Sequence, residues 1–106
     1  MSNAQSGEGM LIALGHFITE PALEEELVSD LRGHRPSVAD GCLFYSFATD
    51  DPGRGSVRVA ECWRDKASLD AHFTSPHMQA FLAKWGDRIT VDVTMYDAAN
   101  PHRYGE

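Results

Sequence analysis

The arrangement of apolar and polar residues divides the chain into strand-like and helix-like segments. Residues 10–19 (MLIALGHFIT) form a mostly apolar run, which predicts a strand that is buried on both faces and central in a sheet. Residues 42–49 and 56–63 have strand-like composition and flank the turn-forming segment 50–55, which predicts a β-hairpin. Residues 89–96 alternate between apolar and polar, and this pattern predicts a last strand.

Helical spacing of apolar residues marks the other segments. The first predicted helix runs from residue 20 to about residue 33, with Pro21 in its first turn. Its apolar face carries Leu23, Leu27, Val28 and Leu31. Two further helices are predicted at 65–73 and 75–86, and each begins with a residue that favours the N-cap position.

The resulting element order is β-α-β-β-α-β, with the second helical part divided in two. Right-handed crossovers turn this order into a ferredoxin-like α+β fold, a four-stranded antiparallel sheet with the helices on one face. Several strands are apolar on both faces, so the free face of the sheet requires a cover, and a second copy of the sheet is the simplest one. The sequence therefore predicts a homodimer in the form of a dimeric α/β barrel.

The register of the hairpin is an assumption at this point. If Thr49 lies opposite Val57, then Tyr45 lies opposite Glu61. One face of the hairpin then carries Leu43, Tyr45, Phe47, Val57, Val59, Glu61 and Trp63. The other face carries Cys42, Phe44, Ser46, Arg58, Ala60, Cys62 and Arg64.

A length of 106 residues suits one domain with one hydrophobic core. The pattern places this domain at residues 10–98. It leaves residues 1–9 as a disordered N-terminal segment or tag remnant and residues 99–106 as a C-terminal tail. No apolar run approaches the roughly 20 residues of a membrane-spanning helix, and no signal peptide is visible, so the expected location is the cytoplasm.

The charge of the chain argues against two classes of partner. The formal net charge is −7, from 16 acidic and 9 basic residues. Such a surface repels phosphate groups, and no cluster of lysine and arginine offsets the repulsion. We therefore expect neither nucleic-acid binding nor membrane binding.

The two cysteines and five histidines lack the spacing of a metal site, so no metal is expected. Cys42 and Cys62 are expected on the same face of the hairpin, where a disulfide is conceivable. Free thiols are favoured, because cytoplasmic proteins rarely keep disulfides.

Residues 61–76 (ECWRDKASLDAHFTSP) carry the most informative pattern. An acidic residue and a large aromatic residue end a strand, a capped helix with a histidine follows, and Ser-Pro starts the next helix. In this pattern the chain resembles the antibiotic-biosynthesis-monooxygenase (ABM) family, and the resemblance extends from about Leu11 to Asp97. It implies a ligand pocket between sheet and helices, with the dimer formed through the opposite face of the sheet. It also implies a monooxygenase without a metal or flavin cofactor, in which the deprotonated substrate itself reduces dioxygen.

By this resemblance, one face of the hairpin and the helices after it enclose the pocket. The candidate catalytic residues are His72, Glu61, Trp63 and Tyr45. The candidate substrate-binding residues are His16, Phe73, Met78 and Phe81. A pocket of this composition suits a small aromatic phenol, a quinol or a polyketide-like compound.

The candidates also have structural interpretations. His72 is either a base or hydrogen-bond partner of the substrate, or a structural histidine that fixes its helix against the strand end. Glu61 either pairs with His72 in the pocket, or lies at the rim and pairs with Arg64 or Lys84. His16 faces either the pocket or the dimer interface, and the pocket is slightly preferred.

Three functions remain open at this point. The first is a cofactor-independent monooxygenase that acts on a small aromatic molecule with dioxygen. The second is isomerisation of a small phosphorylated or keto compound, which would require a basic residue that the predicted pocket face lacks. The third is non-catalytic binding of a small molecule, since the same fold supports both catalysis and simple binding. Haem degradation is disfavoured, because Gly15 and Leu82 occupy the positions of the asparagine and histidine that haem-degrading relatives use.

Overall fold

The computed structural model describes residues 9–105 of the chain. Its helices and strands, with two short 3₁₀ turns (η2 and η3), are β1 (Met10–Ile18), η2 (Pro21–Leu23), α1 (Glu24–Gly33), η3 (Val38–Asp40), β2 (Cys42–Thr49), β3 (Ser56–Trp63), α2 (Lys66–Phe73), α3 (Pro76–Trp85) and β4 (Thr90–Ala98). This order confirms the predicted βαββαβ arrangement, including the division of the second helical part. The predicted N-terminal segment lies outside the described residues except for Gly9.

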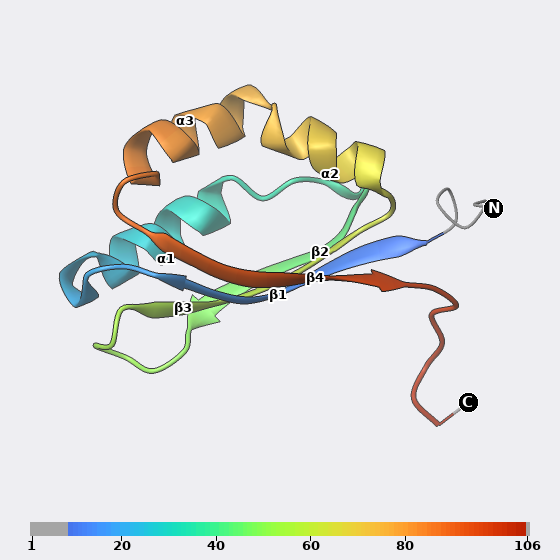
Figure 1. Ribbon diagram of the computed structural model, residues 1–106, viewed down its shortest axis with the longest axis horizontal. Coiled ribbons are helices and arrows are strands. Elements are labelled where there is room, and N and C mark those ends of the chain that lie inside the picture. Colours follow the sequence, from blue (N-terminus) through green and yellow to red (C-terminus); the bar gives the residue numbers. More distant parts are fainter. Residues whose placement is uncertain (1–8, 106) are drawn as a thin grey trace.

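The four strands form one antiparallel sheet in the order β2-β3-β1-β4. β1 pairs with both β3 and β4, so it is central, as predicted. All three helices lie on one face of this sheet (Figure 1). The fold is therefore the predicted ferredoxin-like α+β fold.

The opposite face of the sheet, here called the free face, has no helix over it (Figure 1). The prediction that β1 is buried on both faces is wrong for a single copy of the chain. Leu14 and Ile18 point to the free face, where they are 45% and 43% exposed. Phe44 and Tyr96 lie on the same face and are also exposed.

The hairpin has the predicted register over most of its length, with Tyr45 opposite Glu61. A β-bulge at Leu43 ends this register, because Cys42 instead of Leu43 pairs with Trp63. Cys42 consequently belongs to the core, whereas Leu43 is exposed. The prediction that Leu43 shares a face with Tyr45 is wrong, and so is the prediction that Cys42 and Cys62 share one. Both thiols are free.

The core lies between the helices and the covered face of the sheet. The first predicted helical stripe supplies three fully packed residues, while Leu23 is only partly buried. The residues of the buried cluster are Leu27, Val28, Leu31, Cys42, Tyr45, Phe47, Val57, Val59, Trp63, Leu69, Phe81 and Trp85.

The helices that follow the hairpin begin at the predicted capping residues. The Ser68 backbone N–H donates to Asp65 Oδ1 over 2.8 Å at the start of α2. The Met78 backbone N–H donates to Ser75 Oγ over 3.2 Å at the start of α3. These caps determine where each helix begins, and so they position the histidine of α2 and the apolar face of α3.

A buried glutamate connects α1 to the hairpin turn. Glu24 is only 6% exposed, and its two carboxylate oxygens accept hydrogen bonds from the backbone N–H groups of Gly53 and Gly55, over 2.9 Å and 3.2 Å. At Gly55, a side chain would collide with the backbone carbonyl of Thr19, so glycine is required there. Glu24 is not among the residues singled out from the sequence, so this contact was not predicted.

Candidate active site

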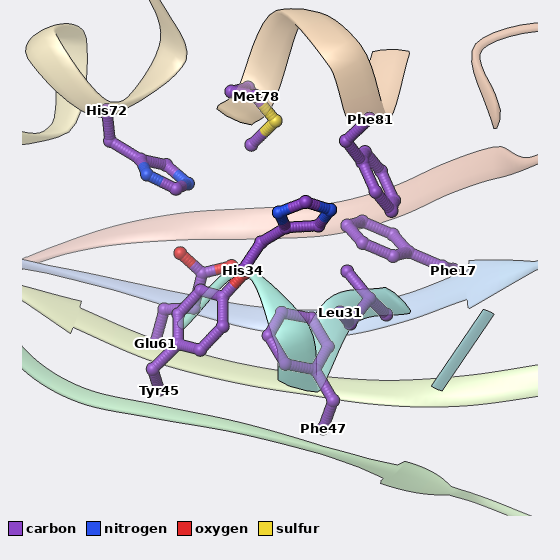
Figure 2. Close-up of a pocket in the computed structure, with 9 residues that line it drawn as sticks. All are labelled: Phe17, Leu31, His34, Tyr45, Phe47, Glu61, His72, Met78 and Phe81. Carbon is purple, nitrogen blue, oxygen red and sulfur yellow. The ribbon is translucent and has the colours of Figure 1, made fainter. Parts of the chain in front are cut away.

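A small cavity lies between the helices and the covered face of the sheet (Figure 2). Its volume is about 30 Å³, which is room for roughly one or two water molecules. Strands β1, β2 and β3 supply its floor, and α1, α2 and α3 supply its walls and roof. The lining residues are Phe17, Leu31, His34, Tyr45, Phe47, Glu61, His72, Met78 and Phe81.

Glu61 is the carboxylic acid of this cavity. Its Oε1 accepts a 2.8 Å hydrogen bond from the indole N–H of Trp63, two residues further along the same face of β3. Burial raises the pKa of the Glu61 carboxyl above its ordinary value, and the Trp63 hydrogen bond opposes this only in part. Glu61 therefore holds a proton at higher pH than an exposed glutamate does.

His72 reaches the cavity from α2. Its ring lies 4.7 Å from the Trp63 ring and 6.2 Å from the Tyr45 ring, centroid to centroid. Its Nε2 is buried and has no hydrogen-bond partner. Burial lowers the pKa of the His72 imidazole, and the charge of Asp40 opposes this only in part. The imidazole is therefore neutral at neutral pH, and Nε2 is free for a ligand.

The two proposed pairings of Glu61 are absent among the described residues. Glu61 makes no ion pair there with His72, Arg64 or Lys84, and its hydrogen bond goes to Trp63 instead. Lys84 binds acidic residues of α1, and Arg64 forms an ion pair with its neighbour Asp65. Both predicted pairings are therefore wrong.

Tyr45 lies beside Glu61 across the hairpin, and Figure 2 shows its hydroxyl pointing toward the Glu61 carboxyl group. Burial, and next the nearby Glu61 charge, raise the pKa of the Tyr45 phenol. Tyr45 is therefore protonated and can donate a hydrogen bond. Arg35 Nη1 donates to the Tyr45 backbone carbonyl over 2.6 Å, which holds this part of β2 against the end of α1.

His34 also lines the cavity, although it is not among the site residues expected from the sequence. It follows α1 directly, as the C-cap residue, and its Nδ1 is buried without a hydrogen-bond partner. A signal for it existed in the sequence, because His34 is three residues after Leu31 and so continues the buried face of the helix. Figure 2 shows the rings of His34 and His72 on the helix side of the cavity, with Glu61 below them.

A family model for antibiotic biosynthesis monooxygenases matches residues 10–84, which is more than half of the chain. The chain belongs to this family. An uncharacterized protein of Synechocystis sp. is 27% identical over 101 residues, which cover 92% of this chain and 69% of that protein.

Two crystal structures show the ABM fold of the chain. A candidate antibiotic biosynthesis monooxygenase from Chloroflexus aurantiacus has a TM-score of 0.75 and 22% identity, over 91% of this chain and 99% of its own. Another, from Caulobacter crescentus, has a TM-score of 0.70 and 19% identity, over 93% and 96% of the two chains. At these identities the likeness concerns the fold.

Five of the eight residues expected from the ABM resemblance line the cavity, namely Tyr45, Glu61, His72, Met78 and Phe81. Trp63 lies behind them, fully buried against His72. Phe73 does not line the cavity and is 49% exposed beside His72.

His16 does not lie in the cavity, although the sequence slightly favoured that position. It points to the free face of the sheet, where its Nε2 lies 3.2 Å from Asp50 Oδ2. Arg58 binds the other oxygen of Asp50 over 2.6 Å. His16 is therefore part of a polar cluster with Asp50 and Arg58, outside the cavity.

Between residues 9 and 105, no three His, Cys, Asp or Glu side chains are grouped closely enough to hold a metal ion. Within the same range, no helix has both the length and the apolar character needed to cross a membrane.

Proposed function

We propose that this chain is a cofactor-independent monooxygenase for a small aromatic phenol, quinol or polyketide-like compound. The observation that carries the proposal is the His72 imidazole, which is neutral and presents an unpartnered Nε2 in an aromatic-lined site. A neutral imidazole at this position can take a proton from a bound phenol. Family membership supports the same reaction class.

In the proposed reaction, His72 Nε2 removes the hydroxyl proton of the substrate, and the resulting anion supplies electrons to dioxygen. A substrate CH₂ carbon conjugated to the anion, as in an anthrone, forms a C–O bond with dioxygen, and its first C–H proton ends on the outer oxygen, which gives a hydroperoxide. Loss of the second C–H proton and cleavage of the O–O bond then leave a carbonyl group and release one water molecule. The four electrons that reduce dioxygen all come from the substrate, and the imidazolium returns its proton.

The remaining polar groups of the cavity have supporting roles in this proposal. Tyr45 is a hydrogen-bond donor, and Glu61 is one as well while it is protonated, so both can stabilise negative charge on a substrate oxygen. Trp63 positions Glu61 and supports the His72 ring, without lining the cavity itself. The apolar residues keep water away from the reacting anion.

An isomerase for a phosphorylated compound receives less support. None of the nine residues that line the cavity is lysine or arginine, so an anionic group would enter without a counter-charge. Arg58 lies on the free face of the sheet, away from the cavity.

The proposed active form is a homodimer that forms through the free face. Exposed Leu14, Ile18, Phe44 and Tyr96 give that face an apolar surface, which an identical sheet would cover. A location in the cytoplasm stays a prediction from the sequence.

Dioxygen consumption with dihydroxynaphthalenes and anthrones tests the proposed function. We expect turnover by the wild type, and we expect a loss of roughly 100-fold or more in kcat for His72→Gln, because the base is removed. His102→Gln is the matched control, since His102 is exposed and lies outside the cavity. A wild-type protein that binds these compounds without consuming dioxygen would instead be a non-catalytic binder.

A further inference from the structure

A second space, here called the outer groove, adjoins the cavity. It lies between residues 33–40, which include the end of α1 and the segment after it, and the region from Arg64 to His77, which includes α2 and the start of α3. Its volume is about 690 Å³. His34 and His72 are the residues that line both the groove and the cavity, so they mark the junction of the two spaces.

The two spaces differ greatly in size. Sites for small molecules usually have volumes of roughly 300–1,000 Å³. The groove falls in this range, whereas the cavity, at about 30 Å³, is too small for an aromatic ring. A ring-sized molecule therefore fits in the groove and reaches the cavity with only one edge.

Each histidine at the junction has an unsatisfied ring nitrogen. Within residues 9–105, His34 Nδ1 and His72 Nε2 are the buried side-chain nitrogen or oxygen atoms that lack a hydrogen-bond partner. Because buried polar atoms in native proteins are nearly always hydrogen-bonded, two such atoms at one junction indicate a place for a polar ligand atom.

The His34 ring is held by contacts that leave Nδ1 free. The backbone N–H of His34 donates a hydrogen bond to the Leu31 carbonyl over 3.3 Å, at the end of α1. Its ring lies 5.5 Å from the His77 ring and meets Phe81 edge-on at 6.4 Å. The ring position is therefore set by aromatic packing, and the nitrogen is available to a ligand.

The positive and negative charges of the arginine and aspartate residues that line the groove are equal in number. Arg35 and Arg64 contribute two positive charges, and Asp40 and Asp65 contribute two negative ones. Both carboxylates also cap the start of a helix through hydrogen bonds. This balance favours an uncharged polar group at the groove end of the ligand over a phosphate or carboxylate.

We propose that His34 contacts the substrate, and that the body of the substrate lies in the outer groove with an oxygen-bearing aromatic edge between His34 and His72. One imidazole accepts a hydrogen bond from a ligand hydroxyl, and the other donates to the same oxygen or its neighbour. The site then selects aromatic molecules with oxygen on the inserted edge. The proposal rests on the proposed function for the chemistry at His72, but ligand binding itself requires no turnover.

Binding of 1-naphthol, with naphthalene as the matched probe without oxygen, tests this arrangement. The measurement is NMR of the histidine rings under argon, with dissociation constants from titration. We expect 1-naphthol to shift the ring signals of both His34 and His72, and naphthalene to bind about tenfold more weakly. We expect His34→Phe to weaken 1-naphthol binding about tenfold and His34→Gln to retain part of the affinity, because the amide can still form a hydrogen bond.

A second pair of variants tests the position of the ligand body. Ala71 is exposed and lines the groove, so Ala71→Trp should fill the groove and weaken 1-naphthol binding about tenfold. Ala83 is exposed on α3 and does not line the groove, so Ala83→Trp is the control and should bind within about twofold of wild type.

The proposal would be overturned if His34→Phe and Ala71→Trp both bound 1-naphthol with wild-type affinity. It would also be overturned if the wild type bound naphthalene as tightly as 1-naphthol, or did not bind 1-naphthol at all. The dioxygen assay separates this outcome from failure of the proposed function. Binding that depends on His34 and Ala71 without any dioxygen consumption would refute the monooxygenase alone. Normal turnover by Ala71→Trp and His34→Phe would refute only the proposed position of the substrate in the outer groove.

Discussion

The indole N–H of Trp63 donates a 2.8 Å hydrogen bond to the carboxyl group of Glu61, two residues earlier on the same strand face. The bond connects a fully buried aromatic residue to the acid of the cavity. Because a strand directs alternate side chains to the same face, the two groups meet without any contribution from a distant segment. Trp63 thus sets the position of the Glu61 carboxyl and lowers the free energy of its ionised form.

Replacing Trp63 by phenylalanine tests this relationship. Trp63→Phe removes the donor and keeps most of the ring, so the pKa of Glu61 should rise further above its ordinary value of 4.5. The measurement is an NMR titration of the Glu61 carboxyl carbon. Trp85→Phe is the control, since Trp85 donates to Asp30 instead. An unchanged Glu61 titration in Trp63→Phe would contradict the assigned role of the indole.

The burial of His72 predicts a loss of stability in acid. Its folded-state pKa lies below the ordinary value of 6.5, so the unfolded chain binds the proton first as the pH falls. The stability that the folded protein gains from neutral His72 is fully present above pH 6.5, and it is lost as the pH falls through the folded-state pKa of His72. The free energy of unfolding should therefore decrease more steeply in the wild type than in His72→Gln as the pH falls below 6.5.

Urea unfolding at several pH values provides this measurement. His102→Gln is the control for replacing a histidine at an exposed position outside the cavity. Equal slopes for His72→Gln and the wild type would show that His72 titrates as it would in the unfolded chain.

The connection between Glu24 and the hairpin turn predicts a large effect on stability. Glu24→Ala leaves two backbone N–H groups, those of Gly53 and Gly55, without their acceptor. We expect a loss of about 3 kcal/mol in the free energy of unfolding, measured by urea denaturation. Glu25→Ala is the control on the exposed side of α1 and should cost less than about 0.5 kcal/mol. Similar values for both variants would mean that the turn does not depend on Glu24.

The free face of the sheet predicts a dimer that a single charge disrupts. Leu14→Asp places a carboxylate at the centre of the proposed interface, so the molecular mass measured by light scattering should change from dimer to monomer. Leu82→Asp is the control, because Leu82 is equally exposed but lies on α3, on the helix side. A monomeric wild type at micromolar concentration would contradict the proposed dimer.

Much of the site follows from the sequence because strand alternation is a local property. Tyr45 and Glu61 share a face of the hairpin once the turn is located, and the capping residues Asp65 and Ser75 locate the helices above them. The bulge at Leu43 could not be foreseen in the same way, since one extra residue reverses the alternation without changing the composition of the strand.

His16 and His34 show the limit of local reasoning. Both faces of β1 are apolar, so alternation alone does not indicate which face the helices cover, and His16 was placed on the wrong one. His34 continues the buried side of α1, but its role depends on contacts with His77 and Phe81, more than 40 positions away.

The sequence by itself determined the type and order of the elements and the alternation of side chains along the hairpin, because spacing and capping act between residues close in the chain. The tertiary structure decided which side chains meet around the cavity. Tyr45 and Glu61 come from the hairpin, His72 from α2 and His34 from the end of α1, and only the packing of both helices against one sheet brings them together. That packing also leaves two ring nitrogens unpartnered, a property of the assembled fold that no single segment carries.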